Sequence, residues 1–403
     1  MEKKKLVYLA IIYFFSALPF GFFYSFIPVF LRTKGVSLAT IGFFSLAGLP
    51  WSLRLLFAPF IDRYLWKPAW MGFALLSLAV TLIGLSFISP KCALFFFLLA
   101  MVSFCSTIFD TSADGFVVEW IPPKELGNAN GVRISAYRVS LIFCGGGAIA
   151  LSGYLGFKPI FYILSLGCLI TGVWLLTSKY LKVKPQRKEI TIYQQFIQPF
   201  KEILSRPKVY WLLLFVFTYK IGDALLGAMV YPFWVDRGFS RVEIGLISGA
   251  IGSVLTIIGS LLGGWLSSRW SLKKSLFVLG LFQSFSNLGY ALASLPNMTK
   301  YAVYGASMIE SFTGGLGTAA FLTFLTALCK KEFSSTQYAV FSTLFTLSLT
   351  ISRSLAGIGA TYLGYTKFFI LTFFVSLPAF LLIPVVTQSC TSEEVCINKD
   401  FSK

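Results

Sequence analysis

Long apolar runs separated by short polar segments make up most of this chain. A helix that spans a bilayer needs about 20 mainly apolar residues. Twelve stretches of about that length can be marked off, near residues 6–31, 40–60, 69–89, 92–117, 131–152, 158–178, 209–233, 242–266, 275–295, 301–327, 338–361 and 367–387. The pattern therefore predicts an all-α membrane protein with 12 transmembrane helices.

The longest polar segment, residues 179–208, divides these runs six and six. Five of its apolar residues follow helical spacing, which predicts an amphipathic helix on the membrane surface despite Pro199: Tyr193, Phe196, Ile197, Phe200 and Leu204. We therefore expect an N-terminal six-helix bundle over 1–178, a cytoplasmic linker over 179–208, a C-terminal six-helix bundle over 209–388 and a cytoplasmic tail over 389–403.

The two halves of the chain repeat one another. Gly35-Val-Ser-Leu-Ala-Thr-Ile-Gly42 recurs as Gly238-Phe-Ser-Arg-Val-Glu-Ile-Gly245, each time between the first and second helix of its half. Tyr154-Leu-Gly-Phe157 recurs as Tyr362-Leu-Gly-Tyr365, between the fifth and sixth. Two six-helix bundles related by parallel repeats resemble the major facilitator fold, in which substrate binds near the middle of the membrane between the halves.

Composition and charge agree with a membrane protein. The chain is 56% hydrophobic and 12% charged, and its mean hydropathy is +0.78. The net charge of +18 would suggest nucleic acid in a soluble protein, but the basic residues lie mostly on one side of the predicted helices. With the N-terminus inside, 21 Lys and Arg are cytoplasmic and 8 are outside. We therefore expect both termini in the cytoplasm and no nucleic-acid partner.

The start of the chain, MEKKKLVYLAIIYFF, has the basic and apolar regions of a signal peptide. The apolar run continues to about Leu31 without a small-residue cleavage site, so we interpret it as the first spanning helix.

Histidine is absent, and the seven cysteines form no CxxC pair. No metal site, disulfide framework or cofactor site follows from these residues. Proton chemistry must then use carboxylates.

The stretch from Phe109 to Arg138 carries charges inside predicted helices, where an ionisable side chain costs roughly 2.5 to 3.5 kcal/mol. Asp110 and Asp114 share one helix face, whereas Arg133 and Arg138 diverge by about 140°. Counted from the centres of their runs, Asp110 and Arg138 both lie about 6 to 8 Å toward the cytoplasm. We therefore predict that Asp110 pairs with Arg138 and that Arg133 lies near the interface.

Further charges lie in the second half. Glu310 and Arg353 occupy the corresponding pair of helices, about 5 to 6 Å toward the outside. We predict that one of the two ion pairs, Asp110 with Arg138 and Glu310 with Arg353, belongs to the cytoplasmic gate and the other to the periplasmic gate. Lys220 and Asp223 are three residues apart and can neutralise each other. An alternative is that all these pairs only hold helices together.

Two basic residues of the second predicted helix point to different roles. Arg54 has no close sequence partner, which leaves it free for an anionic ligand. Asp62 and Arg63 follow Pro59 at the inner end of the helix, where facilitator proteins carry a loop motif thought to latch the cytoplasmic side.

Motifs in both halves resemble the AmpG family of muropeptide permeases, in the facilitator branch that also holds acetyl-CoA transporters. The first half carries Asp110-x-x-x-Asp114-Gly, Pro122-Pro-Lys-Glu125, Tyr137-Arg138 and the Gly145 triplet. The second half carries Tyr219-Lys-x-Gly-Asp-Ala224, Gln283-x-x-Ser-Asn-x-Gly-Tyr290, Glu310-x-x-x-Gly-Gly-x-Gly-Thr318, Leu328-Cys-Lys330 and Phe333-Ser-Ser-Thr-Gln-Tyr338.

This resemblance implies proton-driven import of anhydromuropeptides, GlcNAc-anhydro-MurNAc with or without peptide, across the bacterial inner membrane for cell-wall recycling. Burial favours the neutral form of a carboxylic acid, so the candidates for proton coupling are Asp110, Asp114 and Asp223. An anionic sugar-peptide has carboxylates for basic side chains and hydroxyls for polar ones. The candidates for binding it are Arg54, Tyr219, Lys220, Gln283, Asn287 and Tyr290.

Other functions compete with this interpretation. The same fold could carry acetyl-CoA or another anionic solute, or export drugs, because fold does not fix substrate. A membrane-embedded enzyme is a remote alternative, since the sequence shows no nucleophile motif or metal-ligand spacing. We expect a monomer in the lipid bilayer that uses the proton gradient and no cofactor.

Overall fold

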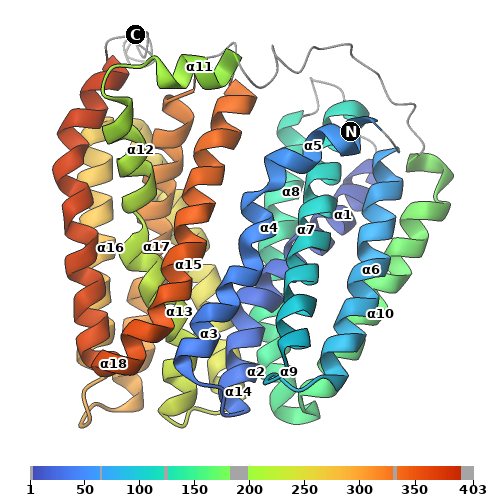
Figure 1. Ribbon diagram of the computed structural model, residues 1–403, viewed down its shortest axis with the longest axis horizontal. Helices are drawn as coiled ribbons and strands as arrows, with labels where there is room; N and C mark the ends of the chain where they lie inside the picture. The colour runs from blue at the N-terminus through green and yellow to red at the C-terminus, as the bar shows by residue number, and fades with distance from the viewer. Residues whose placement is uncertain (1–2, 64–65, 122–125, 182–197, 330–333, 392–403) are drawn as a thin grey trace. The chain divides into compact units, whose positions relative to one another are not determined.

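A computed structural model describes residues 3–63, 66–121, 126–181, 198–329 and 334–391 of the chain. Every regular element in those ranges is a helix (Figure 1). The predicted all-α fold class is confirmed.

The helices of the first half follow the predicted apolar runs, and several are interrupted. In chain order they are α1 (Lys3–Gly21), η1 (Phe22–Phe26), α2 (Ile27–Thr33), α3 (Leu38–Phe44), η2 (Ser45–Gly48), α4 (Leu49–Ser52), α5 (Arg54–Arg63), α6 (Lys67–Phe87), α7 (Ala93–Trp120), α8 (Leu126–Leu141), η4 (Ile142–Gly147), α9 (Ala148–Leu155), α10 (Phe157–Thr177) and η5 (Lys179–Leu181).

The helices of the second half begin with a short one, α11, inside the predicted linker. Its helices are α11 (Gln198–Leu204), α12 (Val209–Thr218), α13 (Ile221–Asp236), α14 (Arg241–Glu243), η7 (Ile244–Ile251), α15 (Gly252–Arg269), α16 (Leu272–Ala293), α17 (Lys300–Ala327) and α18 (Ser334–Thr391).

These elements make up 12 spanning helices. Among the described residues, 10 continuous stretches are long and apolar enough to cross a membrane. The last stretch, Gln337–Thr387, contains a break at Gly364, whose backbone is not helical, so it holds two spans. The interrupted helices between Leu38 and Arg63 supply one more.

The structure confirms the first internal repeat at the level of single hydrogen bonds. Gly35 and Gly238 have φ of 74° and 76°, a conformation that favours glycine. The N–H of Gly35 donates to the Arg32 carbonyl at 2.9 Å, and that of Gly238 donates to the corresponding Val235 carbonyl at 3.0 Å. The same short sequence thus ends one helix in the same way in both halves.

The next helix of each repeat also begins alike. The hydroxyl oxygens of Ser37 and Ser240 each accept a hydrogen bond from the backbone N–H three residues on, both at 3.2 Å. Glu243 completes a capping box with Ser240. Serine at the N-cap satisfies an N–H group that the helix itself leaves without a partner.

By its contacts the chain divides into two compact units. Unit 1 holds residues 1–188, 228–253 and 353–361, and unit 2 holds 189–227, 254–352 and 362–403. The predicted domains, two bundles with a linker between them, stay a prediction. Most of the linker and nearly all of the tail lie outside the described residues.

Glycines let helices of unit 1 approach backbone to backbone. A Cβ on Gly146 of η4 would lie 2.6 Å from the backbone nitrogen of Ala250 in η7. A Cβ on Gly42 of α3 would lie 2.8 Å from the backbone nitrogen of Gly357 in α18. Close packing through small residues is how helices associate in a membrane, where the hydrophobic effect gives no drive.

Within unit 2, the short helix α11 is fastened to the ends of longer helices. Ile203 is buried in a core with Phe215 and Phe324. The Arg206 guanidinium donates to the Leu328 carbonyl at 2.6 Å and pairs with Glu202 at 2.8 Å. The part of the predicted linker from 198 to 208 therefore begins with a helix and packs against this unit.

Candidate functional site

Unit 1 holds a cluster of charged side chains around Asp114, contributed by four helices. The hydroxyl of Tyr13 in α1 donates to Asp114 Oδ1 at 3.1 Å, and Arg133 Nη2 in α8 lies 2.8 Å from the same oxygen. Arg54 Nη2 in α5 pairs with the other oxygen, Oδ2. One carboxylate therefore serves two guanidinium groups, and these three groups together carry one net positive charge.

Arg54 reaches this cluster because the second spanning helix is interrupted. α4 ends at Ser52 and α5 begins at Arg54, so the guanidinium extends from the start of a helix. The side chains of Arg54 and Arg133 are 45% and 40% exposed, whereas that of Asp114 is 23% exposed. The prediction that Arg54 is free of partners is wrong, but both arginines remain accessible to a ligand.

Asp110 lies one turn before Asp114 in α7 and has a different partner. The hydroxyl of Ser16 in α1 donates to Asp110 Oδ1 at 2.6 Å. Among the described residues Asp110 makes no ion pair within 4 Å. The predicted pair between Asp110 and Arg138 is therefore not formed.

The arginine that pairs with an aspartate is Arg133, which the sequence analysis placed near the interface. That depth was counted from an apolar run beginning at 131, but α8 begins at Leu126. Arg133 then lies seven residues into its helix, and Asp114 lies six residues from the end of α7. At 1.5 Å per residue both are about 10 Å from the connecting loop. Their equal depth lets them pair.

Two polar residues of this cluster were missed by the sequence analysis. Tyr13 and Ser16 are buried in α1, and the ring of Tyr13 lies 4.8 Å from the Arg133 guanidinium carbon. Their three-residue spacing in an apolar run was the available signal, because it places both on one helix face. The sequence did not indicate that this face meets α7.

Unit 2 holds a second polar cluster, near the start of α13. Lys220 Nζ lies 2.9 Å from Asp223 Oδ2, as the spacing predicted, and it also donates to Gln283 Oε1 in α16. The side chains of Lys220 and Asp223 are only 5% and 18% exposed. This ion pair is more deeply buried than that of unit 1.

The other residues predicted to bind substrate in unit 2 are buried. The Tyr219 hydroxyl donates to the Leu276 carbonyl at 2.8 Å, and its ring stacks on Phe321 with centroids 5.1 Å apart. Asn287 is 1% exposed, and its side-chain nitrogen has no hydrogen-bond partner among the residues that the structure describes. Tyr290 is fully buried, with its ring 5.6 Å from that of Phe369. A substrate role for these three stays a prediction.

The predicted gate residues fall in different parts of the molecule. The Arg353 guanidinium carbon lies 4.2 Å from the centre of the Tyr24 ring, inside unit 1. Glu310 belongs to unit 2, so the predicted pair between Glu310 and Arg353 stays a prediction. The side chains of Asp62 and Arg63 lie outside the described residues.

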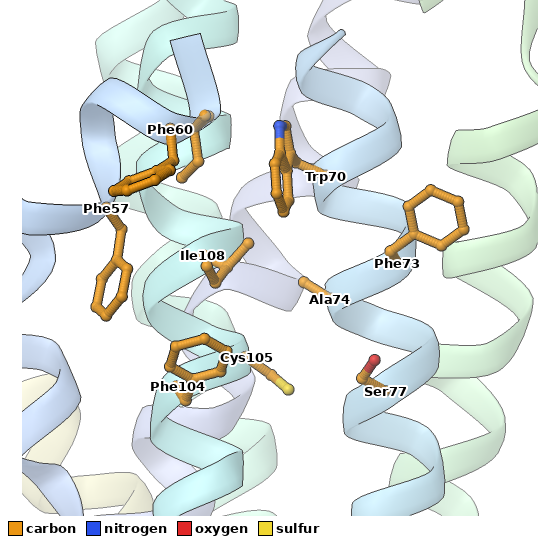
Figure 2. Close-up of a pocket in the computed structure, with 10 residues that line it drawn as sticks. Phe57, Phe60, Trp70, Phe73, Ala74, Ser77, Phe104, Cys105 and Ile108 are labelled. Carbon is orange, nitrogen blue, oxygen red and sulfur yellow. The ribbon is translucent and has the colours of Figure 1, made fainter. Parts of the chain in front are cut away.

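An apolar cavity of about 400 Å³ opens elsewhere in unit 1, between α5, α6 and α7 (Figure 2). Its lining is Phe57, Phe60, Ile61, Trp70, Phe73, Ala74, Ser77, Phe104, Cys105 and Ile108. Such a wall suits an acyl chain better than a sugar rich in hydroxyls, and it contains none of the predicted site residues. The charged clusters are therefore the stronger candidates for a substrate site.

Across the described ranges, no group of His, Cys, Asp or Glu side chains could hold a metal ion.

Sequence comparison defines the class of protein. The family model of the Major Facilitator Superfamily matches residues 9–352 and 221–389. Together these matches cover most of the chain, which belongs to this superfamily of membrane transporters.

Named relatives narrow the likeness and confirm the resemblance to AmpG permeases. The chain is 28% identical to the anhydromuropeptide permease of Escherichia coli K12, over 99% of this chain and 83% of that protein. It is 26% identical to the putative transporter AmpG 4 of Rickettsia conorii, over 91% of this chain and 93% of that protein.

Solved structures support the fold alone. A bacterial homologue of the human lysosomal transporter Spinster, inward-facing and unoccupied, matches with a TM-score of 0.78 at 16% identity, over 96% of this chain and 97% of that one. A D-xylose-proton symporter matches with a TM-score of 0.74 at 12% identity, over 93% and 96%.

Proposed function

We propose that this chain imports anhydromuropeptides across the bacterial inner membrane by proton-coupled alternating access. The observation that carries the proposal is the sharing of Asp114 by Arg54 and Arg133. Positive charge in excess is expensive in a membrane-spanning segment and is retained where it meets a partner. The relatives named as anhydromuropeptide permeases support the choice of cargo.

The chemistry of the cluster matches such a cargo. A muropeptide carries lactyl or peptide carboxylates, and guanidinium groups bind carboxylates through two parallel hydrogen bonds. The arginines already share one carboxylate, so a substrate carboxylate would relieve the shortage of negative charge. Because both arginines are partly exposed, they can exchange partners without opening a packed core.

The coupled proton requires an acid that can lose its charge. Of the three carboxylates predicted for this role, Asp114 and Asp223 are held in ion pairs. Asp110 accepts only the Ser16 hydroxyl in an uncharged contact at 2.6 Å. We therefore favour Asp110 among the three.

The proposal also covers the orientation of the chain, its oligomeric state and the fate of the substrate. Both termini are in the cytoplasm, the chain works as a monomer in the bilayer, and it releases its substrate unmodified. The proton gradient replaces any cofactor.

Uptake of labelled anhydromuropeptide into proteoliposomes, with and without a pH gradient, tests the function. We expect accumulation only with the gradient, and its loss in the Arg133→Gln variant. Arg138→Gln is the matched control in the same helix, because Arg138 makes no ion pair with the aspartates. Equal loss in both variants would contradict the assignment of Arg133.

Competition with unlabelled solutes tests the cargo. Anhydromuropeptide should displace the label, whereas acetyl-CoA, drugs and unrelated anionic solutes should not. If acetyl-CoA alone displaces the label, the cargo is acetyl-CoA rather than anhydromuropeptide.

A further inference from the structure

Glu310 differs from the aspartates at the centres of the two clusters. It lies in α17, about 5 Å from the middle of that helix. Within the part of the chain that the structure describes, the side chain of Glu310 makes no ion pair. Asp114 and Asp223 each have a cationic partner. A lone carboxylate in a spanning helix is expensive when charged and is retained mainly for function.

The carboxylate of Glu310 and the amide of Gln283 both approach Gly314. A Cβ built on Gly314, one turn further along α17, would lie 3.7 Å from Glu310 Oε1 and 3.8 Å from Gln283 Nε2. These two atoms therefore flank the same glycine. The end of the amide that approaches this glycine is its donor end.

The other end of Gln283 is tied to the buried ion pair. Its Oε1 accepts from Lys220 Nζ, which pairs with Asp223 at 2.9 Å. A Cβ on Gly317 would overlap the Gln283 amide oxygen, so glycine at this position leaves room for the bond. A row of polar groups thus runs from Glu310 through Gln283 and Lys220 to Asp223.

Lys220 and Asp223, near the start of α13, are the charged groups that act on Glu310 electrostatically. With Glu310 protonated, the formal charges of the three residues sum to zero. When Glu310 ionises, two carboxylates compete for one ammonium group. The state of Glu310 therefore decides how Lys220 and Gln283 distribute their hydrogen bonds.

We propose that Glu310 takes up and releases the coupled proton in unit 2, and that Gln283 and Lys220 transmit its state to Asp223. On release the O–H bond of the carboxylic acid breaks, the proton passes to water and the electron pair stays on the carboxylate. The inference rests on the proposed function, and it adds an acid that the sequence analysis assigned only to a gate.

Two transport measurements on the full chain in proteoliposomes test this role. One is accumulation of anhydromuropeptide driven by a pH gradient, and the other is exchange of labelled for unlabelled substrate at equal pH and concentration. We expect Glu310→Gln to lose accumulation and to keep exchange at the wild-type rate, because exchange needs no net proton movement. Retained accumulation, or loss of both in a folded variant, would overturn the proposal.

Glu243→Gln is the matched control. Glu243 completes a helix cap, a role that glutamine also fills, so both measurements should stay at the wild-type level. If the Glu243→Gln variant loses accumulation, the assay responds to any Glu→Gln change, and the assignment of the proton to Glu310 is overturned.

An infrared measurement separates this inference from the choice of cargo. In the absence of substrate, the difference spectrum between acid and alkaline buffer should contain a protonated carboxylic acid band that Glu310→Gln removes. If the band is unchanged in the Glu310→Gln variant, the inference is wrong even if that variant has lost transport. A wild type that carries no anhydromuropeptide would contradict the proposed function, and the band would still decide the role of Glu310.

Discussion

The charged clusters of units 1 and 2 each pair basic side chains with an aspartate, but they differ in charge balance and in exposure. In unit 1, Arg54 and Arg133 share Asp114, and the arginine side chains are 45% and 40% exposed. In unit 2, Lys220 and Asp223 neutralise each other, and Glu310 adds a carboxylate without an ion pair. The cluster of unit 1 has more basic groups than paired carboxylates, whereas the cluster of unit 2 has a carboxylic acid in addition to its ion pair.

This difference indicates how the two tasks of a coupled transporter can be divided. Exposed guanidinium groups can bind and release an anion, because little packing has to change. A buried, balanced ion pair beside a lone acid responds to a single proton, because burial raises the cost of each unpaired charge. We therefore assign substrate charge to unit 1, and we assign to Glu310 of unit 2 a response to protons that adds to that of Asp110 in unit 1.

The largest effect is expected from Lys220→Met. This change leaves Asp223 buried without its cation, and breaking a buried pair costs roughly 3 to 5 kcal/mol. Thermal unfolding in detergent should show a strongly destabilised protein.

The double variant with Asp223→Asn checks the cause of that loss. Removing the stranded charge should restore much of the stability without restoring proton-driven uptake. If the double variant is no more stable than Lys220→Met, then the pair is not the reason for the loss.

Arg54→Gln should act on binding rather than on folding. A hydrogen bond to a charged group contributes about 1.5 to 3 kcal/mol, so KM for anhydromuropeptide should rise about ten- to hundredfold. Initial rates of uptake at several substrate concentrations measure this. An unchanged KM would remove Arg54 from the substrate site and weaken the contrast between the units.

Gly317→Ala should destabilise unit 2 by breaking the hydrogen bond between Gln283 and Lys220. The added Cβ displaces the Gln283 amide from Lys220, which costs about 1.5 to 3 kcal/mol if no new partner is found. Gly305→Ala in the same helix is the control, because a Cβ there meets nothing within 4 Å. Thermal unfolding of the two variants should differ, and equal behaviour would argue against a structural role for the Gln283 bond.

Tyr219→Phe should have the smallest effect. Its hydroxyl donates to the Leu276 carbonyl, and a neutral hydrogen bond contributes about 1 kcal/mol. We expect a slight loss of stability and no change in KM. A raised KM would return Tyr219 to the substrate-binding residues predicted from the sequence.

The sequence by itself determined the number of spanning helices, their repeat and the positions of the charges within them. These properties follow from local rules. The length of an apolar run decides whether it can cross a bilayer, and glycine with a following serine ends one helix and begins the next. The local pairing of Lys220 with Asp223 also follows from spacing alone.

Only the tertiary structure decided which side chains meet across helices. Arg133 rather than Arg138 pairs with an aspartate, and Arg133 lies deeper than its apolar run suggested because α8 begins at Leu126. Tyr13 and Ser16 join the site because α1 turns their face toward α7. The depth and rotation of a helix depend on where it begins and on what packs against it, and an apolar run specifies neither.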